Sequence, residues 1–224
     1  KQLTRELNRQ EVAIWKKVIR VISHELNNSL APISSMAHSG RILTREPDPA
    51  RLESVFGSIE ERAHHLKSFI DGYARFAKLP APRIENVAWA PFLATLRDLA
   101  PFTLTGAAPA AAARFDPTQM QQVLINLLKN AHESGSPQGA VTLSLRQDGE
   151  GTRMDVADAG PGMAPEVLEQ ALLPFYSTKQ SGTGLGLPLC REIIEAHGGR
   201  LSLANREGGG LMVSIWLPLH AGSH

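Results

Sequence analysis

Two asparagines in the second half of the chain are spaced so that both side chains could bind one ligand. Asn126 and Asn130 are separated by Leu-Leu-Lys, in a stretch whose apolar spacing predicts a helix from Pro117 to Ser134. Residues four apart on a helix project from the same face, so the two carboxamides lie one turn from each other. Paired oxygen donors suit a hard cation such as Mg²⁺. A pair of solvent-facing polar residues is the alternative, and the spacing alone leaves both open.

A glycine-rich stretch further along the chain could bind an anion. The run Gly-Thr-Gly-Leu-Gly at 182–186 leads into a helix predicted from Leu185 to His197. Bare backbone N–H groups at a helix N-terminus attract negative charge, because the helix dipole is positive there. The run fits neither the P-loop nor the dinucleotide pattern, since no Gly-Lys-Ser/Thr follows. Lys179 could add a mobile positive charge, although a loop lysine is more often merely solvated.

A carboxylate stands where a predicted strand ends. Asp158 follows a strand predicted to end at Val156, and it precedes Gly160 and Gly162. A carboxylate in this place can accept a hydrogen bond from an amino group of a ligand, while glycines let the backbone approach that ligand closely. On its own the Asp-x-Gly-x-Gly pattern is often only a turn.

The first part of the chain places a histidine on the outside of a long helix. Apolar residues at three- and four-residue spacings predict an amphipathic helix from about Glu6 to Leu43. The members of this stripe are Trp15, Val18, Ile19, Ile22, Leu26, Leu30 and Ile33. At about 100° per residue the stripe centres near Ile22, and His24 falls almost opposite, toward solvent. A lone exposed histidine usually has no chemical role, so its setting decides.

The setting of His24 resembles the H-box in the dimerization and phosphoacceptor domain of sensor histidine kinases. The run His-Glu-Leu-Asn-Asn-Ser-Leu, from His24 to Leu30, carries the resemblance. The resemblance implies that His24, as a neutral imidazole, attacks the γ-phosphorus of ATP, and that Glu25 orients the ring or accepts its proton. Asn28 matches the family position that positions water when phosphatase activity occurs.

The chain departs from the H-box pattern just after Asn28. The family's usual proline five residues after the histidine is Ser29 here, and a proline stands at Pro32 instead. Pro32 has no N–H to donate to the carbonyl of Asn28, so we predict a kink beside the phosphoacceptor turn. We hypothesise that this kink is a hinge for signal-driven bending. A tolerated kink without a switching role is the alternative.

The later motifs resemble the ATP-binding boxes of the same family. The resemblances are the N-box around Asn126 and Asn130, the G1 box at 158–163, the F-box at 174–179 and the G2 box at 182–187, which ends the ATP lid. These resemblances imply that Asn130 ligates Mg²⁺ and that Asp158 accepts a hydrogen bond from the amino group of adenine. They also imply nucleotide contacts from Asn126, Gly160, Gly162, Lys179, Gly182, Thr183, Gly184, Leu185 and Gly186.

All five boxes occur in the family's order, so the chain is identified as resembling the cytoplasmic core of a bacterial sensor histidine kinase of the nitrogen-regulation (NtrY- or NtrB-like) type. The implied activity is ATP-dependent autophosphorylation of His24, followed by transfer to an aspartate in the receiver domain of a response regulator, with phosphatase activity left open. Relatives that hydrolyse ATP, such as gyrase, carry Glu at the position of Asn126. An ATP-hydrolysing machine and a non-catalytic dimeric scaffold are the rival hypotheses.

The expected fold class is α+β, with two domains that position these motifs. Two apolar stripes joined by a proline-rich turn at 45–49 predict an antiparallel helical hairpin over residues 1–79. A hairpin cannot cover both of its apolar faces, so we expect a homodimer in which two hairpins form a four-helix bundle. Packing of the helices on the C-terminal domain is the alternative. Residues 80–83 are the expected linker, stiffened by two prolines, and 84–220 the expected ATP-binding α/β sandwich of the GHKL (Bergerat) type.

Within the second domain the patterns predict alternating strands and helices. The predicted elements are a strand at 84–89, a helix at 91–99, a strand ending near 115, a helix at 117–134, a strand hairpin at 141–156 turning at 148–151, a helix at 185–197, and strands at 201–204 and 211–217. The low-complexity stretch Ala107–Ala113 is expected to be a loop or a weak strand.

The bulk composition narrows the partners and the compartment. The chain has 23 Lys plus Arg against 22 Asp plus Glu, so it has no broad basic surface for nucleic acid. The single cysteine, Cys190, cannot form an internal disulfide and is expected to be a buried apolar residue. No apolar stretch approaches the roughly 20 residues of a membrane-spanning helix. Together with these observations, the resemblance to sensor histidine kinases implies a cytoplasmic fragment of a protein that is anchored in the bacterial inner membrane through an N-terminal region outside this chain.

Overall fold

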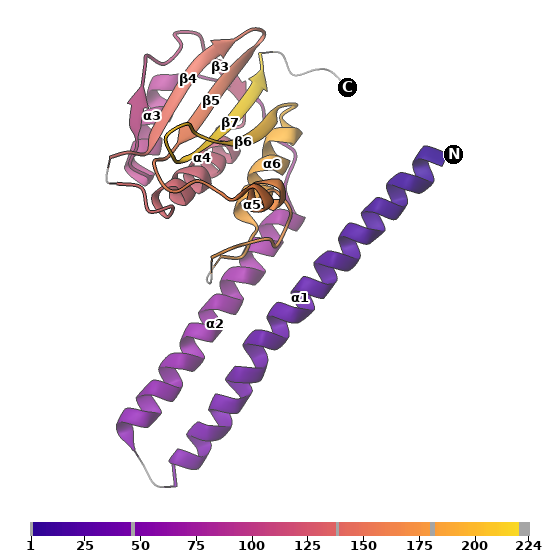
Figure 1. Ribbon diagram of the computed structural model, residues 1–224, viewed down its shortest axis with the longest axis vertical. Helices are drawn as coiled ribbons and strands as arrows, with labels where there is room; N and C mark the ends of the chain where they lie inside the picture. Colours follow the sequence, from indigo (N-terminus) through magenta and orange to yellow (C-terminus); the bar gives the residue numbers. More distant parts are fainter. Residues whose placement is uncertain (1, 46–47, 138, 180–181, 220–224) are drawn as a thin grey trace. The chain divides into compact units, whose positions relative to one another are not determined.

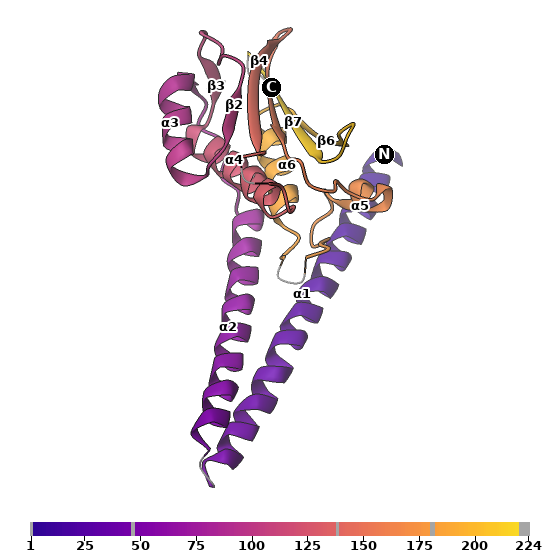
Figure 2. The same cartoon turned by 60° about the vertical axis from the view of Figure 1, so that its left-hand side comes forward.

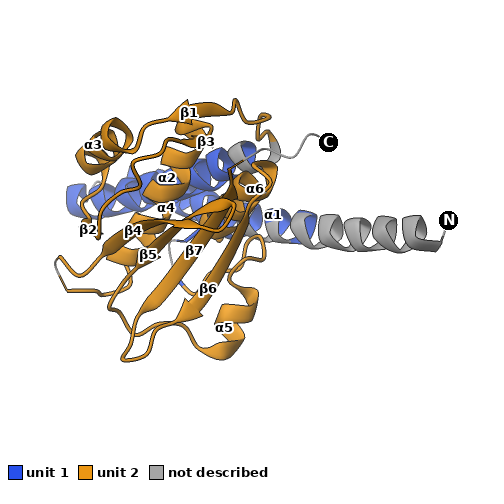
Figure 3. Ribbon diagram, turned by 90° about the horizontal axis from the view of Figure 1, so that it is seen from above, with its two compact units in different colours: residues 1–77, 179–183 blue, residues 78–178, 184–224 orange. Residues whose placement is uncertain are grey.

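The computed structural model describes residues 2–45, 48–137, 139–179 and 182–219, except for the side chains of residues 2–18, 21, 24–25 and 75–77. The chain divides into two compact units, which are coloured separately in Figure 3. The first unit is residues 1–77 with 179–183, and the second is residues 78–178 with 184–224. We describe each unit by itself.

The first unit contains a hairpin of two long helices, α1 (Gln2–Leu43) and α2 (Pro49–Ala77) (Figure 1). Two backbone bonds close the end of α1, one of them from the N–H of Thr44 to the carbonyl of Gly40 at 3.1 Å. Asp48 begins the return, because its Oδ1 accepts the N–H of Arg51 at 3.2 Å as a helix cap does. The two predicted helices are confirmed, while residues 46 and 47 of the predicted turn lie outside the described part of the chain.

Pro32 lies inside α1, which continues through it without interruption. Figure 1 shows α1 as one continuous helix. The predicted loosening beside the phosphoacceptor turn therefore does not break the helix. The hinge role of Pro32 stays a hypothesis.

Several large apolar side chains of the hairpin remain exposed. Phe69 is buried, but apolar residues along both helices are about half exposed or more: Ile19 (60%), Leu30 (51%), Ile42 (54%), Phe56 (60%) and Ile70 (48%). Large apolar side chains that stay exposed along both helices are available to pack against a partner surface. The expectation that one hairpin cannot cover its own apolar residues agrees with these exposures.

The second unit is built on a five-stranded mixed sheet with strand order β2-β4-β5-β7-β6. Strand β2 (Thr103–Thr105) is parallel to β4 (Thr142–Asp148), and the remaining neighbours are antiparallel. The other strands of this sheet are β5 (Gly151–Ala157), β6 (Arg200–Asn205) and β7 (Leu211–Pro218). A separate antiparallel pair joins β1 (Glu85–Val87) to β3 (Ala113–Phe115).

Helices α3 (Trp89–Leu99), α4 (Pro117–His132) and α6 (Gly186–Ala196) supply the other layer of the core. Helix α4 packs against both α3 and α6 (Figure 2). Leu143 and Leu145 of β4 alternate with less buried neighbours, whereas β5 and β7 are buried at most of their positions. The fully buried residues of this core include Leu96, Met120, Leu124, Leu127, Leu128, Leu143, Met154, Ile193, Ile194 and Ile215.

Most predicted elements of this unit are present within a few residues of their expected bounds. The predicted strand hairpin is confirmed, since Asp148 pairs with Gly151 at its turn. Two short elements were missed: the three-residue strand β2 and helix α5 (Pro165–Gln170). Three residues carry too little alternation to indicate a strand, and α5 buries none of its residues fully, so neither has a clear apolar period.

Candidate functional site

Helix α4 carries the two asparagines on a rigid support. Asp116 caps the helix, because its Oδ1 accepts the N–H groups of Thr118 at 2.9 Å and Gln119 at 3.0 Å. Pro117 occupies the first turn, where a missing N–H costs nothing. The apolar face of α4 is buried in the core, while Asn126 and Asn130 are half-buried. The predicted projection of both carboxamides from one support is therefore possible in this fold.

Both asparagines lie on the side of α4 that packs against α6. Asn126 lies beside the thiol of Cys190 in the interior of the helix pair. One turn further along α4, Nδ2 of Asn130 lies 3.9 Å from the place that a side-chain carbon on Gly186 would occupy. The structure thus brings Asn130, and not Asn126, to the N-terminus of α6.

The N-terminus of α6 has the features of an anion site. No side chain among the described residues caps this eleven-residue helix, whose N-cap residue is Leu185. Pro188 has no N–H, which leaves the backbone N–H groups of Gly186 and Leu187 to face a ligand. An anion bound there would lie next to the carboxamide of Asn130.

The segment from Phe175 to Gly184, which leads into α6, is closed by a backbone hydrogen bond between its two end residues. Phe175 and Gly184 both have a φ of 65°, which is unusual for a phenylalanine. The N–H of Phe175 donates to the carbonyl of Gly184 at 2.9 Å. A side-chain carbon on Gly184 would lie 2.6 Å from the backbone of Phe175, so only glycine fits. The segment between them is therefore a closed loop.

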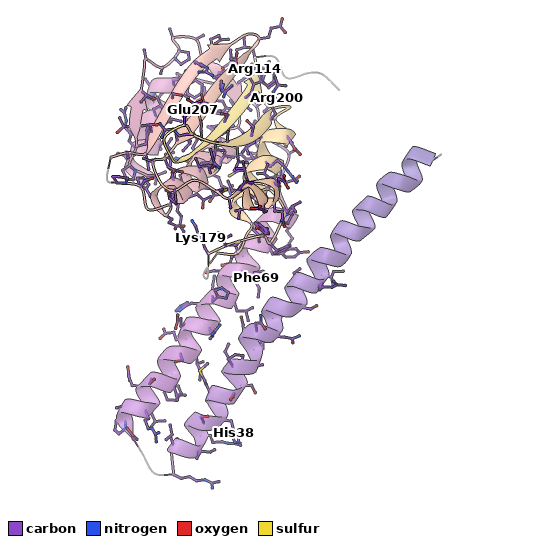
Figure 4. The ribbon with its side chains drawn as sticks, viewed as in Figure 1. His38, Phe69, Arg114, Lys179, Arg200 and Glu207 are labelled. Atoms are coloured by element: carbon purple, nitrogen blue, oxygen red, sulfur yellow. The ribbon has the colours of Figure 1, made fainter. Side chains whose placement is uncertain are left out.

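The predicted lid residues lie on this loop. The N–H of Gly182 donates to the carbonyl of Lys179 at 3.2 Å, and residues 180 and 181 between them are outside the described part. The side chain of Lys179 is exposed and is labelled in Figure 4. Gly182 and Thr183 are half-buried. None of these contacts assigns a ligand to the loop.

Asp158 directly follows the last residue of the central strand β5 and is buried, with only 4% of its surface exposed. Its Oδ1 accepts the N–H of Gly160 at 2.8 Å and that of Leu211 at 3.2 Å. Among the described residues, no donor lies within hydrogen-bond distance of Oδ2. One oxygen therefore holds the turn, and the second can accept a hydrogen bond from a ligand.

The two glycines after Asp158 are required by close packing. A side-chain carbon on Gly160 would lie 2.5 Å from Oγ of Ser134, and one on Gly162 would lie 2.6 Å from Oδ1 of Asn205. Gly162 also has a φ of 75°, which disfavours other residues. The glycines thus shape the turn that presents Asp158.

Three supporting residues were missed by the sequence analysis. Ser136 Oγ accepts the N–H of Ala159 at 3.0 Å, and Asn205 exchanges two hydrogen bonds with the backbone of Met163, at 2.9 and 2.7 Å. Arg206 donates to the carbonyl of Asp158. Each is more than twenty residues away in the sequence from the backbone group it binds, so no local pattern could have indicated it.

The run from His24 to Leu30, which resembles an H-box, lies within α1. His24 and Glu25 are helical, but their side chains are outside the described set, so the predicted outward direction of His24 stays a prediction. Asn28 is exposed, and Ser29 next to it is buried at 2%. The position of Ser29 explains why a small residue is tolerated there, because it packs inside the hairpin.

A Mg²⁺ ion fits this donor set only together with phosphate oxygens. The described residues contain no group of three His, Cys, Asp or Glu side chains that could hold a metal by themselves. Mg²⁺ commonly uses one or two protein oxygens and takes its remaining ligands from phosphates and water. The carboxamide of Asn130, next to the bare N-terminus of α6, matches that requirement.

Cys190 is fully buried, as expected, and burial raises the pKa of its thiol to about 12 although Asn126 lies beside it. At about pH 8 the thiolate fraction would be on the order of one in ten thousand. We therefore expect iodoacetamide to leave Cys190 unmodified in the folded chain and to alkylate it completely in urea, as measured by mass spectrometry. Rapid alkylation of the folded chain would contradict the packing of α4 on α6.

Known proteins resemble the chain in both sequence and fold. Residues 115–221 match the family described as histidine kinase-, DNA gyrase B-, and HSP90-like ATPase. A sensor histidine kinase of Rickettsia bellii, named NtrY-like, is 32% identical over 232 residues, which cover 96% of this chain and 38% of the relative. The chain thus spans less than half the length of that curated relative.

Two solved structures have a similar fold. The catalytic domain of the histidine kinase ThkA is 28% identical with a TM-score of 0.55, covering 61% of this chain and 96% of that one. The histidine kinase ThkA in complex with the response regulator protein TrrA matches with a TM-score of 0.76 at 22% identity, covering 96% of this chain and 65% of that chain. Residues 115–221 thus match the histidine kinase-, DNA gyrase B- and HSP90-like ATPase family, and the chain as a whole is similar in sequence to the sensor histidine kinases named NtrY-like.

Proposed function

We propose that the chain transfers the γ-phosphoryl group of ATP to His24 and then to an aspartate in the receiver domain of a response regulator. The observation that carries the proposal is the juxtaposition of Asn130 with the bare N-terminus of α6, in a unit that also presents a free oxygen of Asp158. These groups suit the phosphates and the base of one nucleotide. The nucleophile, His24, is supplied by α1 of the same chain.

The nucleotide would be bound by three groups of residues. Oδ2 of Asp158 accepts a hydrogen bond from the amino group of adenine, and the backbone N–H groups of Gly186 and Leu187 donate hydrogen bonds to phosphate oxygens. Asn130 holds Mg²⁺, which neutralises phosphate charge when bound. Lys179 and Thr183 on the loop contribute donors that can follow the phosphates. Asn126 stabilises the packing of α4 on α6 beneath the site, where it lies beside Cys190.

Phosphoryl transfer requires positioning and charge neutralisation more than covalent chemistry by the protein. A ring nitrogen of neutral His24 attacks the γ-phosphorus, the bond from that phosphorus to the β,γ-bridging oxygen breaks, and ADP leaves. Glu25 orients the ring and accepts the ring proton, which would otherwise oppose the transfer. The product is a phosphohistidine that a receiver aspartate can attack in turn.

The hairpin would function as a homodimer. Ile19, Leu30, Ile42, Phe56 and Ile70 expose apolar surface that a second hairpin can cover. A twofold pair of hairpins forms a four-helix bundle, in which the same residues of both copies meet. The exposed Asn28 would then be available to position water for dephosphorylation of the regulator.

None of the described helices is long and apolar enough to cross a membrane. We propose that attachment to the inner membrane, and the sensing of the stimulus, are functions of parts of a longer protein. The similar relative is consistent with this, because the chain covers only 38% of its length.

Incubation of the purified chain with γ-labelled ATP and Mg²⁺ tests the proposal. We expect label on the protein that is stable to base and lost in acid, as phosphohistidine is, and transfer of that label to a receiver domain. Steady release of phosphate without a labelled protein would instead favour an ATP-hydrolysing machine. Failure to bind nucleotide in a calorimetric titration would favour a non-catalytic scaffold.

A further inference from the structure

The segment that leaves α2 is fastened to the ATPase unit and is not a free linker. Nε2 of Gln119 donates to the carbonyl of Pro80 at 2.9 Å. The N–H of Arg83 donates to Oδ2 of Asp116 at 2.9 Å. Glu85 then pairs with Phe115 as β1 joins β3. We call residues 80–83 the strap. It belongs to the second compact unit, which begins at Lys78.

The same aspartate connects the strap to both helices of the nucleotide site. Oδ1 of Asp116 caps α4, and its Oδ2 holds the strap. The backbone N–H of Asp116 donates to Nε2 of His197 at 3.1 Å. The other ring nitrogen of His197, Nδ1, lies 2.7 Å from the carbonyl oxygen of Ile193. Because a carbonyl oxygen can only accept, Nδ1 carries the proton and donates to it. His197 follows the last residue of α6. The strap, the start of α4 and the end of α6 therefore meet at Asp116.

Asp116 is well suited to hold these contacts in its ionised form. Burial raises the pKa of its carboxyl, but the N–H groups of Arg83, Gln119 and Thr118 outweigh burial and hold the pKa below its ordinary value. Hydrogen bonds to an ionised acceptor are stronger than bonds between neutral groups. The strap is thus attached by a charge-assisted bond and by a second bond from a buried amide.

We propose that Asp116 and Gln119 are positioning residues for phosphoryl transfer, because they fasten the strap to α4 and confine rotation of α2 against the strap to Lys78 and Leu79. Helix α2 ends at Ala77, so only these two residues separate it from the strap. Leu79 precedes a proline, which restricts its backbone to extended conformations. The inference rests on the proposed function, since it names residues that help to position the γ-phosphate of ATP for attack by His24.

Two substitutions remove the strap contacts with little damage to the fold. In Gln119→Met, a side chain of similar length replaces a buried amide whose Oε1 has no hydrogen-bond partner among the described residues. In Asp116→Asn, the new residue caps α4 as well as aspartate does. The NH₂ group of the asparagine, however, faces the N–H of Arg83, and two donors cannot form a hydrogen bond with each other. Thr118→Ala is the matched control, because this exposed side chain in the same turn makes no hydrogen bond in the described structure while its backbone bond is kept.

We expect both strap variants to lower the single-turnover rate of His24 phosphorylation about tenfold, since loss of orientation slows transfer without touching the reacting groups. The Kd for a non-hydrolysable ATP analogue should change by less than about twofold, because Asn130 and Asp158 lie elsewhere on the unit. Hydrogen exchange at the amide of Arg83 should become faster in both variants. The Thr118→Ala chain should match the unaltered chain in all three measurements.

Three results would overturn the inference. Phosphorylation at the original rate, with a fast-exchanging Arg83 amide, would show that the strap only stabilises the fold. A parallel loss of nucleotide affinity would assign both residues to the integrity of the site. An unaltered chain that binds nucleotide but takes no label would overturn the proposed function, and the inference with it, whereas the first two results leave the proposed function intact.

Discussion

Replacement of His24 by glutamine is expected to abolish labelling of the chain by γ-labelled ATP. Glutamine keeps the length and polarity of the side chain and is compatible with the helix, but its amide nitrogen has no lone pair free to attack phosphorus. Nucleotide binding should persist, because none of the residues proposed for it lies on α1 or α2. Labelling is measured by autoradiography, and binding by calorimetry on the same preparation.

His38→Gln is the matched control for this substitution. His38 lies on α1 as well and is exposed (Figure 4), and its one hydrogen-bond contact among the described side chains is with Arg41 on its own helix, at 3.3 Å. The control chain should take label like the unaltered chain. Label retained by the His24→Gln chain would remove His24 from the mechanism, and loss of label in both chains would show that α1 tolerates no such change.

The hairpin could be predicted from sequence because its signal is long and local. The three- and four-residue spacing persists from Trp15 to Ile33, and prolines mark the turn. The strand hairpin between β4 and β5 was predicted for a similar reason, since alternation flanks a Gly-containing turn. The strap could not be predicted, because its bonds join Pro80 and Arg83 to residues of α4 more than thirty positions away.

In the candidate site, too, one part can be predicted from the local sequence and the other depends on how the helices pack. That Asn126 and Asn130 share a side of α4 follows from helical geometry alone. Which of them reaches the N-terminus of α6 depends on how α4 is aligned with α6, and this alignment places Asn126 beside Cys190. Helical spacing alone treats the two asparagines alike, whereas the N-box resemblance assigns Mg²⁺ to Asn130, the residue that the packing places at the N-terminus of α6.

The conversion of Asp158 to asparagine is expected to weaken ATP binding by about tenfold to a hundredfold, the range for loss of a hydrogen bond to a charged acceptor. The turn should survive, because the asparagine Oδ1 can still accept the N–H groups of Gly160 and Leu211. The atom facing the ligand, however, becomes an NH₂ donor. It would oppose the amino group of adenine and could bind the carbonyl oxygen that guanine carries at the same ring position.

Titration of the Asp158→Asn chain with ATP and with GTP therefore measures the role of this residue in two ways. ATP affinity should fall and the preference for ATP over GTP should narrow, while Asp148→Asn, an exposed change in the same sheet, should alter neither. Unchanged ATP affinity would show that Oδ2 of Asp158 does not contact the base. Equal loss for both nucleotides would assign Asp158 to the support of the turn, and base selection would then have to come from the backbone around Gly160 and Gly162.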